Sequence, residues 1–447
     1  MNGQHLSVAF GALLVLCGCE NAEEPKVPVT MRVPRGERAE FLATPFPSDL
    51  LRRPTGGLNL EAFPNPYGSE SLEELIGLFQ SASGFSSSAP LYFHVAGGVA
   101  QGSLPADAAA SMAPDATLFL VELAAPARRI PIDHQIYLDG TPSLPAGTVG
   151  VAPVLGVVVN GPAALVVTTE ARHTSGVRLG PSEDMSALLR CDGDFDIAGI
   201  DCRPYADALA ALQLDAHDVA LLQLFTPAEA TLALRRAVAA LRDEEPPSSS
   251  GWKRSDELHS QYVLYEGVVA LAQLQAGTPP YARLDGASGG FVLDGNGVPQ
   301  IQRYEDVPVV LTVPLGEPPP EGWPIAIYGH GTGGDLRSGI GDGARFEAHQ
   351  LARAGFAMMA TAEPLHLGRS GYIAGNEEVA TFNFLNPLAG RDNWRQSAYE
   401  KAQLVSLAQS LFLSTEVTGD VTVQFDPESI GYFGHSQGGV VGSLLVG

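Results

Sequence analysis

The run Gly434–Gly438 has the residue types and spacing of a serine nucleophile held in a tight turn. It reads Gly-His-Ser-Gln-Gly, follows an apolar, strand-like segment at Ser429–Phe433 and precedes a small, apolar run at Gly439–Val446 that can begin a helix. Small flanking residues permit a sharp strand-to-helix turn that raises the serine hydroxyl above the sheet edge, where it can attack a carbonyl carbon. We therefore predict Ser436 as a nucleophile. The alternative is an ordinary glycine turn.

A glycine-rich loop offers the groups that such a reaction needs next. Tyr328–Gly334 reads Tyr-Gly-His-Gly-Thr-Gly-Gly and follows a strand-like run at Pro324–Tyr328. Glycines let the backbone approach a substrate and direct N–H groups at the negative charge that develops on the carbonyl oxygen. The predicted donors of this oxyanion hole are Gln437, which follows the nucleophile, and Thr332 or Gly331. A phosphate loop is the alternative, but the run lacks the Gly-Lys-Ser/Thr ending.

A base that would activate Ser436 is not evident. Eleven residues follow the serine, and they contain no Asp, Glu or His. His435 is adjacent to the serine, where the side chain of such a turn points away from the reacting centre, and His330 is expected to act through the backbone of its loop. His366 precedes the serine in a loop that could approach it. Because a serine without a base is a weak nucleophile, we expect residues 1–447 alone to be nearly inactive.

Strands and helices alternate in the region that must position these residues. The predicted elements are strands at Val309–Val313, Pro324–Tyr328, Phe356–Thr361 and Ser429–Phe433, and helices at Ala344–Ala354 and Trp394–Phe412. The second helix has apolar residues at intervals of three or four. Alternation of this kind predicts βαβ units and a parallel sheet over residues 261–447.

The preceding part of the chain has a different pattern. From about Pro45 to Arg242, strand signals dominate, with β-rich runs at Pro90–Val95, Thr117–Leu123, Gly156–Val159 and Ala163–Thr168. Helices are predicted at Leu72–Phe79 and, as a pair, over Tyr205–Arg242. We predict a β-sandwich-like domain at residues 37–242. Acidic, proline and serine residues follow one another in Asp243–Gly251, which predicts a linker at residues 243–260.

The two glycine motifs together resemble the α/β-hydrolase superfamily. Ser436 lies 105 residues after Gly331, enough for two intervening βα units. More narrowly, Pro45–Leu50 and Asn386–Gln396 are similar to segments of bacterial extracellular lipases that carry a virulence-factor-lipase N-terminal domain. This resemblance implies an immunoglobulin-like β domain followed by an α/β-hydrolase core with lipase or esterase activity on an ester or lipid substrate, without a cofactor or metal.

The superfamily pattern also implies where the missing groups lie. Its triad runs serine, then Asp or Glu, then histidine along the chain. The resemblance therefore implies that the acid, the histidine and the last strands lie beyond residue 447, so that residues 261–447 are the N-terminal part of the core. Two alternatives stay open: a catalytically inactive, surface-anchored binding protein, and another serine hydrolase such as a peptidase or a polyester depolymerase.

The first residues indicate export. The apolar run Leu6–Leu16 is too short to span a bilayer and suits the core of a signal peptide. It ends in Leu-Cys-Gly-Cys, which resembles the lipobox of bacterial lipoproteins and implies a signal peptide at residues 1–18, lipid on Cys19 and a tether at residues 19–36. The implied location is the bacterial cell envelope, with a lipid anchor in the outer membrane or at the cell surface. A plain secretory signal is the alternative.

Charge and cysteine content restrict the partners further. With 26 Lys+Arg against 50 Asp+Glu, the net charge of −24 argues against nucleic acid as a partner. Cys191 and Cys202 could pair in an oxidising compartment or remain free thiols. The acidic run Asp192–Asp196 lacks the glycine and glutamate positions of an EF-hand, so we predict a solvated loop and no metal site. The uncharged stretch Gly140–Thr169 is broken by prolines and glycines, unlike a membrane helix.

Overall fold

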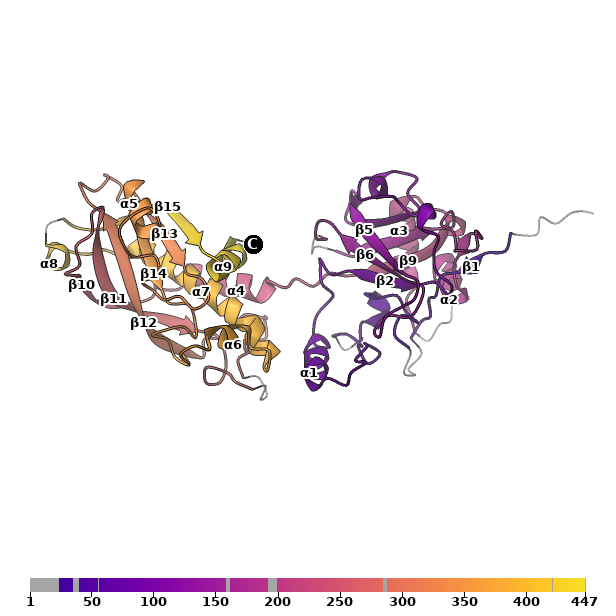
Figure 1. The fold of residues 1–447 in the computed structure, drawn as a ribbon, viewed down its shortest axis with the longest axis horizontal. Helices are drawn as coiled ribbons and strands as arrows, with labels where there is room; N and C mark the ends of the chain where they lie inside the picture. Colours follow the sequence, from indigo (N-terminus) through magenta and orange to yellow (C-terminus); the bar gives the residue numbers. More distant parts are fainter. Residues whose placement is uncertain are drawn as a thin grey trace, which may run out of the picture. The chain divides into compact units, whose positions relative to one another are not determined.

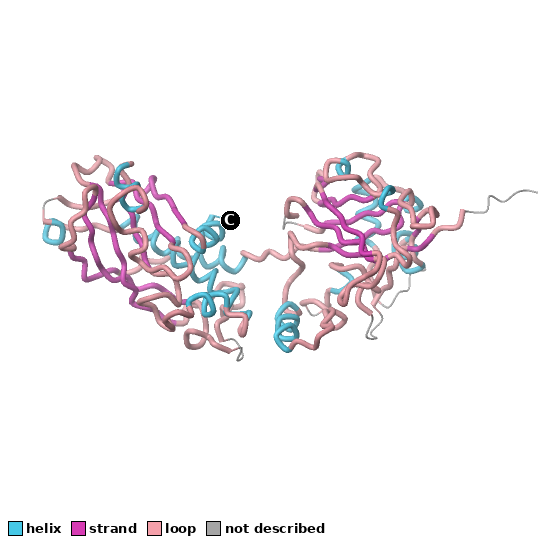
Figure 2. Tube along the Cα trace, in the orientation of Figure 1, coloured by secondary structure: helices cyan, strands magenta, loops and turns pink. Residues whose placement is uncertain are grey.

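The computed structural model describes residues 24–34, 40–54, 56–157, 161–191, 199–283, 288–419 and 421–446. The chain forms two compact units (Figure 1). The first consists of Met1–Pro66 with Gly84–Ala228, and the second of Tyr67–Ser83 with Glu229–Gly447. Strands dominate the first unit, whereas the second combines one large sheet with helices (Figure 2).

The first unit contains two antiparallel sheets. One has the order β4-β3-β7-β9 and the other the order β2-β6-β5. Their strands are β2 (Leu91–His94), β3 (Leu118–Glu122), β4 (Arg128–Ile130), β5 (Ile132–Tyr137), β6 (Thr148–Pro153), β7 (Ala163–Thr168) and β9 (Val219–Phe225). A short parallel pair, β1 (Val27–Pro28) with β8 (Leu179–Gly180), completes the strands described there. Because β3, β7 and β9 are buried along nearly their whole length, both faces of the four-stranded sheet are covered.

The strands predicted over residues 90–95, 117–123 and 163–168 are confirmed as β2, β3 and β7. The predicted strand Gly156–Val159 falls partly outside the described residues. The helix pair predicted over Tyr205–Arg242 is wrong in its middle, since β9 separates α3 (Arg203–Leu212) from α4 (Leu232–Ala240). The apolar run of β9 is short and continuous, and periodicity alone does not distinguish such a buried strand from a helix. Helix α2 (Glu183–Arg190) precedes α3 in this unit.

The second unit is built on a six-stranded sheet with the order β10-β11-β12-β14-β13-β15. These strands are β10 (Ser249–Arg254), β11 (Tyr262–Gln273), β12 (Arg303–Pro314), β13 (Trp323–Gly329), β14 (Ala357–Thr361) and β15 (Phe425–Gly434). Only β14, β13 and β15 pair in parallel. The parallel sheet predicted over residues 261–447 is therefore wrong for β11 and β12, and β10 adds a further antiparallel strand. These strands follow one another without a crossover helix, and a parallel neighbour requires such a crossover.

The boundary between the units differs from the predicted one. Residues 243–260, predicted as a linker, include β10, whose largely exposed, polar residues suit the edge of a sheet. Helix α4 also belongs to the second unit, because Leu234 and Ala237 pack with Ala398 and Tyr399 of α7 (Pro387–Ser410). Burial against α7 thus draws the end of the predicted β domain into the second unit.

Helices cover the two faces of the large sheet. Alternate residues of a strand point to opposite faces, so Val309 and Leu311 of β12 pack with Leu404 of α7, while Val310 packs with Ala348 of α5 (Glu347–Arg353). The other helices of this unit are α1 (Glu70–Phe79), α6 (Glu377–Phe382), α8 (Thr415–Thr418) and α9 (Gln437–Val446). The predicted helices at Leu72–Phe79, Ala344–Ala354 and Trp394–Phe412 are confirmed as α1, α5 and α7.

The long helix α7 begins where its sequence dictates. The side chain of Asn386 accepts a hydrogen bond from the N–H of Ala389, and Pro387 occupies the first helical position. No helix in the part of the chain that the structure describes has both the length and the apolarity of a membrane span.

Candidate active site

Ser436 lies in the turn that joins β15 to α9. Its backbone is left-handed, with φ of 51°. A side chain in this conformation costs about 1–2 kcal/mol relative to the right-handed one, so the surrounding structure must impose it. The residue is exposed at the carboxyl end of a parallel strand. The serine is therefore presented to solvent by a strained strand-to-helix turn.

Close contact between backbone segments explains the glycines of the motif. A Cβ atom on Gly438 would overlap the carbonyl oxygen of Gly329, at the end of β13, and one on Gly434 would overlap the backbone of Gly438. The N–H of Gly438 donates to the carbonyl oxygen of His330 at 3.1 Å, and the N–H of His435 donates to that of Gly329 at 3.0 Å. The turn is thus packed and hydrogen-bonded against the loop that follows β13.

The predicted oxyanion-hole residues lie beside the serine. A Cβ atom on Gly331 would stand 3.2 Å from Cβ of Ser436. The hydroxyl of Thr332 donates to Oε1 of Gln437 at 2.8 Å, which links the loop to the first residue of α9. Within the described residues, neither the N–H of Thr332 nor that of Gln437 donates a hydrogen bond. Both N–H groups are therefore available to a substrate oxygen.

His330 is held in the neutral form by its surroundings. Its Nε2 accepts the backbone N–H of Glu363 at 2.9 Å, which places the ring proton on Nδ1 and lets Nδ1 donate to the carbonyl oxygen of Gly331 at 2.8 Å. Burial lowers the pKa of His330 to about 4, against the opposing charge of Glu363. With both nitrogens engaged, His330 fixes the Gly331 carbonyl and is not free to accept a proton from the serine.

The other two candidate histidines do not engage the serine either. His366 is fully buried, its Nδ1 lies 3.0 Å from the carbonyl oxygen of Pro364, and its ring meets that of His330 edge to face at 5.0 Å between centroids. His435 is exposed beside Gly331. Within the described residues, no hydrogen bond joins the hydroxyl of Ser436 to a histidine.

A buried ion pair lies behind the loop and was missed from the sequence. Nζ of Lys401, in α7, stands 2.9 Å from Oε1 of Glu363, and both side chains are fully buried. Nζ also donates to the hydroxyl of Thr361 at 3.3 Å. The N–H of Glu363 donates to His330, which in turn holds the Gly331 carbonyl of the glycine-rich loop. The ion pair therefore fixes the residue on which the position of this loop depends. The burial of Lys401 could have been expected from the sequence, because Lys401 is next to Ala402 on the face of α7 that the apolar spacing predicts to be buried.

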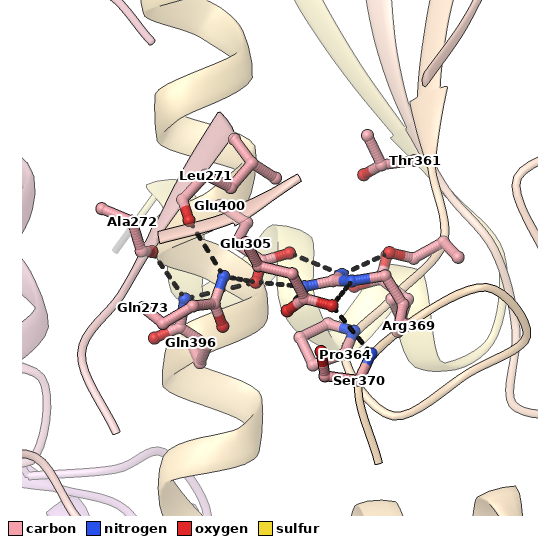
Figure 3. A network of polar contacts seen from close by, with 12 residues as sticks. Leu271, Ala272, Gln273, Glu305, Thr361, Pro364, Arg369, Ser370, Gln396 and Glu400 are labelled. Atoms are coloured by element: carbon pink, nitrogen blue, oxygen red, sulfur yellow. Dashed lines mark hydrogen bonds and ion pairs between the residues drawn. The ribbon is translucent and has the colours of Figure 1, made fainter. Parts of the chain in front are cut away.

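A second buried network fixes the segment after β14 (Figure 3). Arg369 donates to both carboxylate oxygens of Glu400, at 2.8 and 2.9 Å, and to both of Glu305, at 3.1 and 3.2 Å. Gln273 and Gln396 also donate to Glu400, at 2.9 and 3.2 Å. Paired, fully hydrogen-bonded charges are the form in which burial is tolerated. The network ties the segment to β11, β12 and α7.

The segment held by this network exposes apolar side chains. Val379, Phe384 and Leu385, in and after α6, are 62%, 79% and 65% exposed. Parallel strands end at one edge of a sheet, so a segment that leaves β14 begins on the edge where the serine turn lies. The segment therefore starts at the edge of the sheet that presents the serine.

The remaining predicted site residues belong to other parts of the chain. The structure joins Cys191 to Cys202 in a disulfide with Cα atoms 5.4 Å apart. Cys19 and the acidic run 192–196 fall outside the described residues. Across the described ranges, no group of three or more His, Cys, Asp or Glu side chains is arranged to hold a metal ion.

Comparison with known proteins gives only distant likenesses. No protein-family model and no curated protein matches the sequence. Among solved structures, the chain is similar to a Bacteroides fragilis protein assigned as an acetyl xylan esterase, at 13% identity and a TM-score of 0.28 over 48% of this chain and 49% of that one. It is also similar to an acetyl xylan esterase from Paenibacillus sp. R4, at 18% identity and a TM-score of 0.26 over 48% of this chain and 54% of that one. A cold-adapted esterase from an Arctic intertidal metagenomic library matches at 15% identity and a TM-score of 0.23, over 44% of this chain and 60% of that one. The chain thus spans about half the length of these structures, and the TM-scores are too low to carry a function over.

Proposed function

We propose that this chain carries the nucleophile and the oxyanion hole of a serine carboxylic-ester hydrolase, a lipase or esterase. One observation carries the proposal: an exposed serine in a left-handed strand-to-helix turn lies against a glycine-rich loop, and N–H groups of the turn and of the loop have no acceptor within the described residues. An ordinary glycine turn would not require this packing against a second loop.

The geometry supports a specific sequence of steps. Oγ of Ser436 attacks the ester carbonyl carbon while its proton passes to a base. The N–H groups of Gln437 and of Thr332 or Gly331 stabilise the negative oxygen that forms. The intermediate expels the alcohol, which takes the proton from the base, and leaves an acyl-serine that water hydrolyses to the carboxylic acid.

The base and its acid partner are proposed to come from strands that pair with β15. This strand forms one edge of the described sheet, and its Phe433 is 47% exposed. An open edge with an exposed aromatic side chain is suited to further pairing. A histidine supplied from that side would complete the triad that His330, His366 and His435 do not provide.

The proposed setting is the bacterial cell envelope, with the protein anchored through lipid on Cys19 or secreted. The proposed substrate is an ester or a lipid. No cofactor, metal or nucleic acid takes part in the proposed reaction.

Covalent labelling by a fluorophosphonate tests the nucleophile. We expect the native protein, purified from its own cells, to be labelled on the peptide that contains Ser436. A form of the protein without the base should react far more slowly, because loss of the triad histidine lowers kcat of subtilisin on the order of a million-fold. Ser436→Ala should abolish labelling, whereas Ser443→Ala, at an exposed serine of α9, should leave it unchanged.

The outcomes separate the competing functions. No labelling of Ser436 in the native protein would refute the proposal and favour an inactive, surface-anchored binding protein. If Ser436 is labelled, a panel of p-nitrophenyl esters of increasing acyl length, a peptide amide and a polyester film distinguishes a lipase or esterase from a peptidase or a polyester depolymerase.

A further inference from the structure

The first unit contains a cavity that the proposed hydrolysis does not use. Its volume is about 610 Å³, within the range of small-molecule sites. It lies between α3, the short 3₁₀ helix η1 (Asp49–Leu51) and the ends of β3 and β9. A cavity of this size can accommodate an organic molecule rather than only a few water molecules.

The cavity walls are mainly apolar and rest on regular structure. One wall is a single face of α3, formed by Pro204, Tyr205, Ala208 and Ala211, whose spacing places them on the same side of the helix. Aliphatic side chains face the same space from η1 and from the ends of the strands, namely Leu50, Leu123 and Leu224. Such walls favour a ligand with an apolar body.

Tyr205 offers an unused polar group within these walls. The residue is only 4% exposed, yet within the described residues its hydroxyl has no hydrogen-bond partner. Because Tyr205 lines the cavity, this hydroxyl is available to form a hydrogen bond with a ligand there. Burial also raises the pKa of Tyr205, so the hydroxyl keeps its proton and can donate or accept.

Carboxylates outnumber cations around the cavity. Asp49, Asp201 and Asp207 contribute to its lining, with Arg52 as the only lining cation among the described residues. Asp49 accepts hydrogen bonds from the N–H and the hydroxyl of Thr226, at 3.0 and 2.7 Å, and stands 3.7 Å from Arg52. Asp201 pairs with Arg203, which does not line the cavity. A carboxylate has about four acceptor sites, so Asp49 retains capacity for a further donor.

We propose that this cavity binds a small organic cation, in which an apolar body lies against α3 and the strand ends and an ammonium group meets Asp49 and the hydroxyl of Tyr205. The apolar walls account for the body of such a ligand, and the Tyr205 hydroxyl and the excess of carboxylates account for its ammonium group.

The disulfide stabilises one wall of this site. Gly199, Ile200 and Asp201 line the cavity and lie inside the loop that Cys191 and Cys202 close. Opening the disulfide frees this wall, so the reduced protein should bind the cation more weakly than the oxidised protein.

Isothermal titration of the intact protein with three matched probes tests the ligand class. 2-Phenylethylammonium carries the proposed charge, 2-phenylethanol has the same body without charge, and 3-phenylpropanoate carries the opposite charge. We expect the ammonium to bind at least about tenfold more tightly than the alcohol and the carboxylate to bind most weakly. Equal binding of all three, tightest binding of the carboxylate, or no binding of the ammonium would overturn the proposal.

Variants of α3 locate the binding. Tyr205→Phe should weaken the ammonium about tenfold while leaving the alcohol's apolar contacts in place. Ala211→Trp should fill the cavity and abolish binding, whereas Ala210→Trp, at an exposed position outside the lining, should leave the affinity unchanged. Unchanged binding in Ala211→Trp would place the ligand elsewhere and refute the site, and circular dichroism of the two tryptophan variants controls for misfolding.

Discussion

Replacing Ser436 by glycine should stabilise the second unit while it removes the proposed nucleophile. The left-handed backbone at Ser436 costs about 1–2 kcal/mol for a residue with a side chain. Glycine avoids that cost but gains conformational freedom in the unfolded chain, which offsets about 0.4–1 kcal/mol. The residue is exposed and its hydroxyl has no hydrogen bond within the described residues, so little else is lost. The expected net gain in unfolding free energy is about 0.8 kcal/mol, within a range of about 0–1.6 kcal/mol.

Urea and thermal unfolding of two variants measure this gain. Ser436→Ala removes the hydroxyl but keeps a side chain in the strained conformation, so its stability should match the wild type to within about 0.5 kcal/mol. Ser436→Gly should unfold at higher urea and at a temperature higher by about 1–4 °C, because 1 kcal/mol corresponds to roughly 2–4 °C in a domain of this size. Neither variant should react with a fluorophosphonate.

A control at Gln213 separates backbone strain from other effects. Gln213 follows α3, is exposed and has φ of 55°, and it belongs to the other unit. Gln213→Gly should exceed Gln213→Ala in stability by a similar amount, with labelling of Ser436 unchanged. If the glycine variant gains stability at Gln213 but not at Ser436, the turn does not strain the serine and the reasoning about the nucleophile fails.

Three further predictions concern the surroundings of the serine. His330 has a pKa of about 4 when folded and about 6.5 when unfolded, so the unfolded chain binds more protons between these pH values. The free energy of unfolding should therefore fall by about 2 kcal/mol from pH 7 to pH 5. Urea unfolding of His330→Gln should lack this pH-dependent loss. Lys401→Met should lower the free energy of unfolding by about 3–5 kcal/mol, because it leaves Glu363 buried without a partner. In a double-mutant cycle, adding Glu363→Gln should recover part of this loss, and strictly additive effects of the two substitutions would contradict the pairing. Gly438→Ala should cost about 3 kcal/mol or more because its Cβ atom overlaps the end of β13, whereas Gly439→Ala, whose nearest neighbouring atom is 3.7 Å away, should cost less than 1 kcal/mol in the same denaturation assay.

The local parts of the candidate site could be predicted from the sequence. The serine turn and the glycine-rich loop each lie within a few consecutive residues, and the strands before them are short apolar runs. Their meeting point also follows, because the carboxyl ends of neighbouring parallel strands share one edge of a sheet. The support for His330 could not be predicted, since it depends on Glu363 and Lys401, which are remote in sequence and brought together only by the packing of α7 on the sheet.

The errors in the fold have a common physical origin. The sequence of β9 does not distinguish a strand from part of a helix, because a buried strand and a buried helix have the same apolar composition over seven residues. The sequence of β10 predicts a linker because an edge strand exposes polar residues as a linker does. Whether β10, β11 and β12 run parallel or antiparallel depends on the length and type of the segments that connect them. The apolar pattern of the strands themselves does not show which kind of segment lies between them.

The tight packing of Gly434 and Gly438 determines which residues of the serine turn could change during evolution. These glycines are required because three backbone segments touch, a demand that persists whether or not the serine reacts. A descendant that had lost its chemistry would still be selected to keep them, since a Cβ atom at either position would damage folding. The serine, exposed and strained, would be the first to be replaced, and glycine would be the favoured replacement. The glycines therefore reflect the packing of the turn, and of the residues between them only Ser436 would show whether the proposed chemistry is retained.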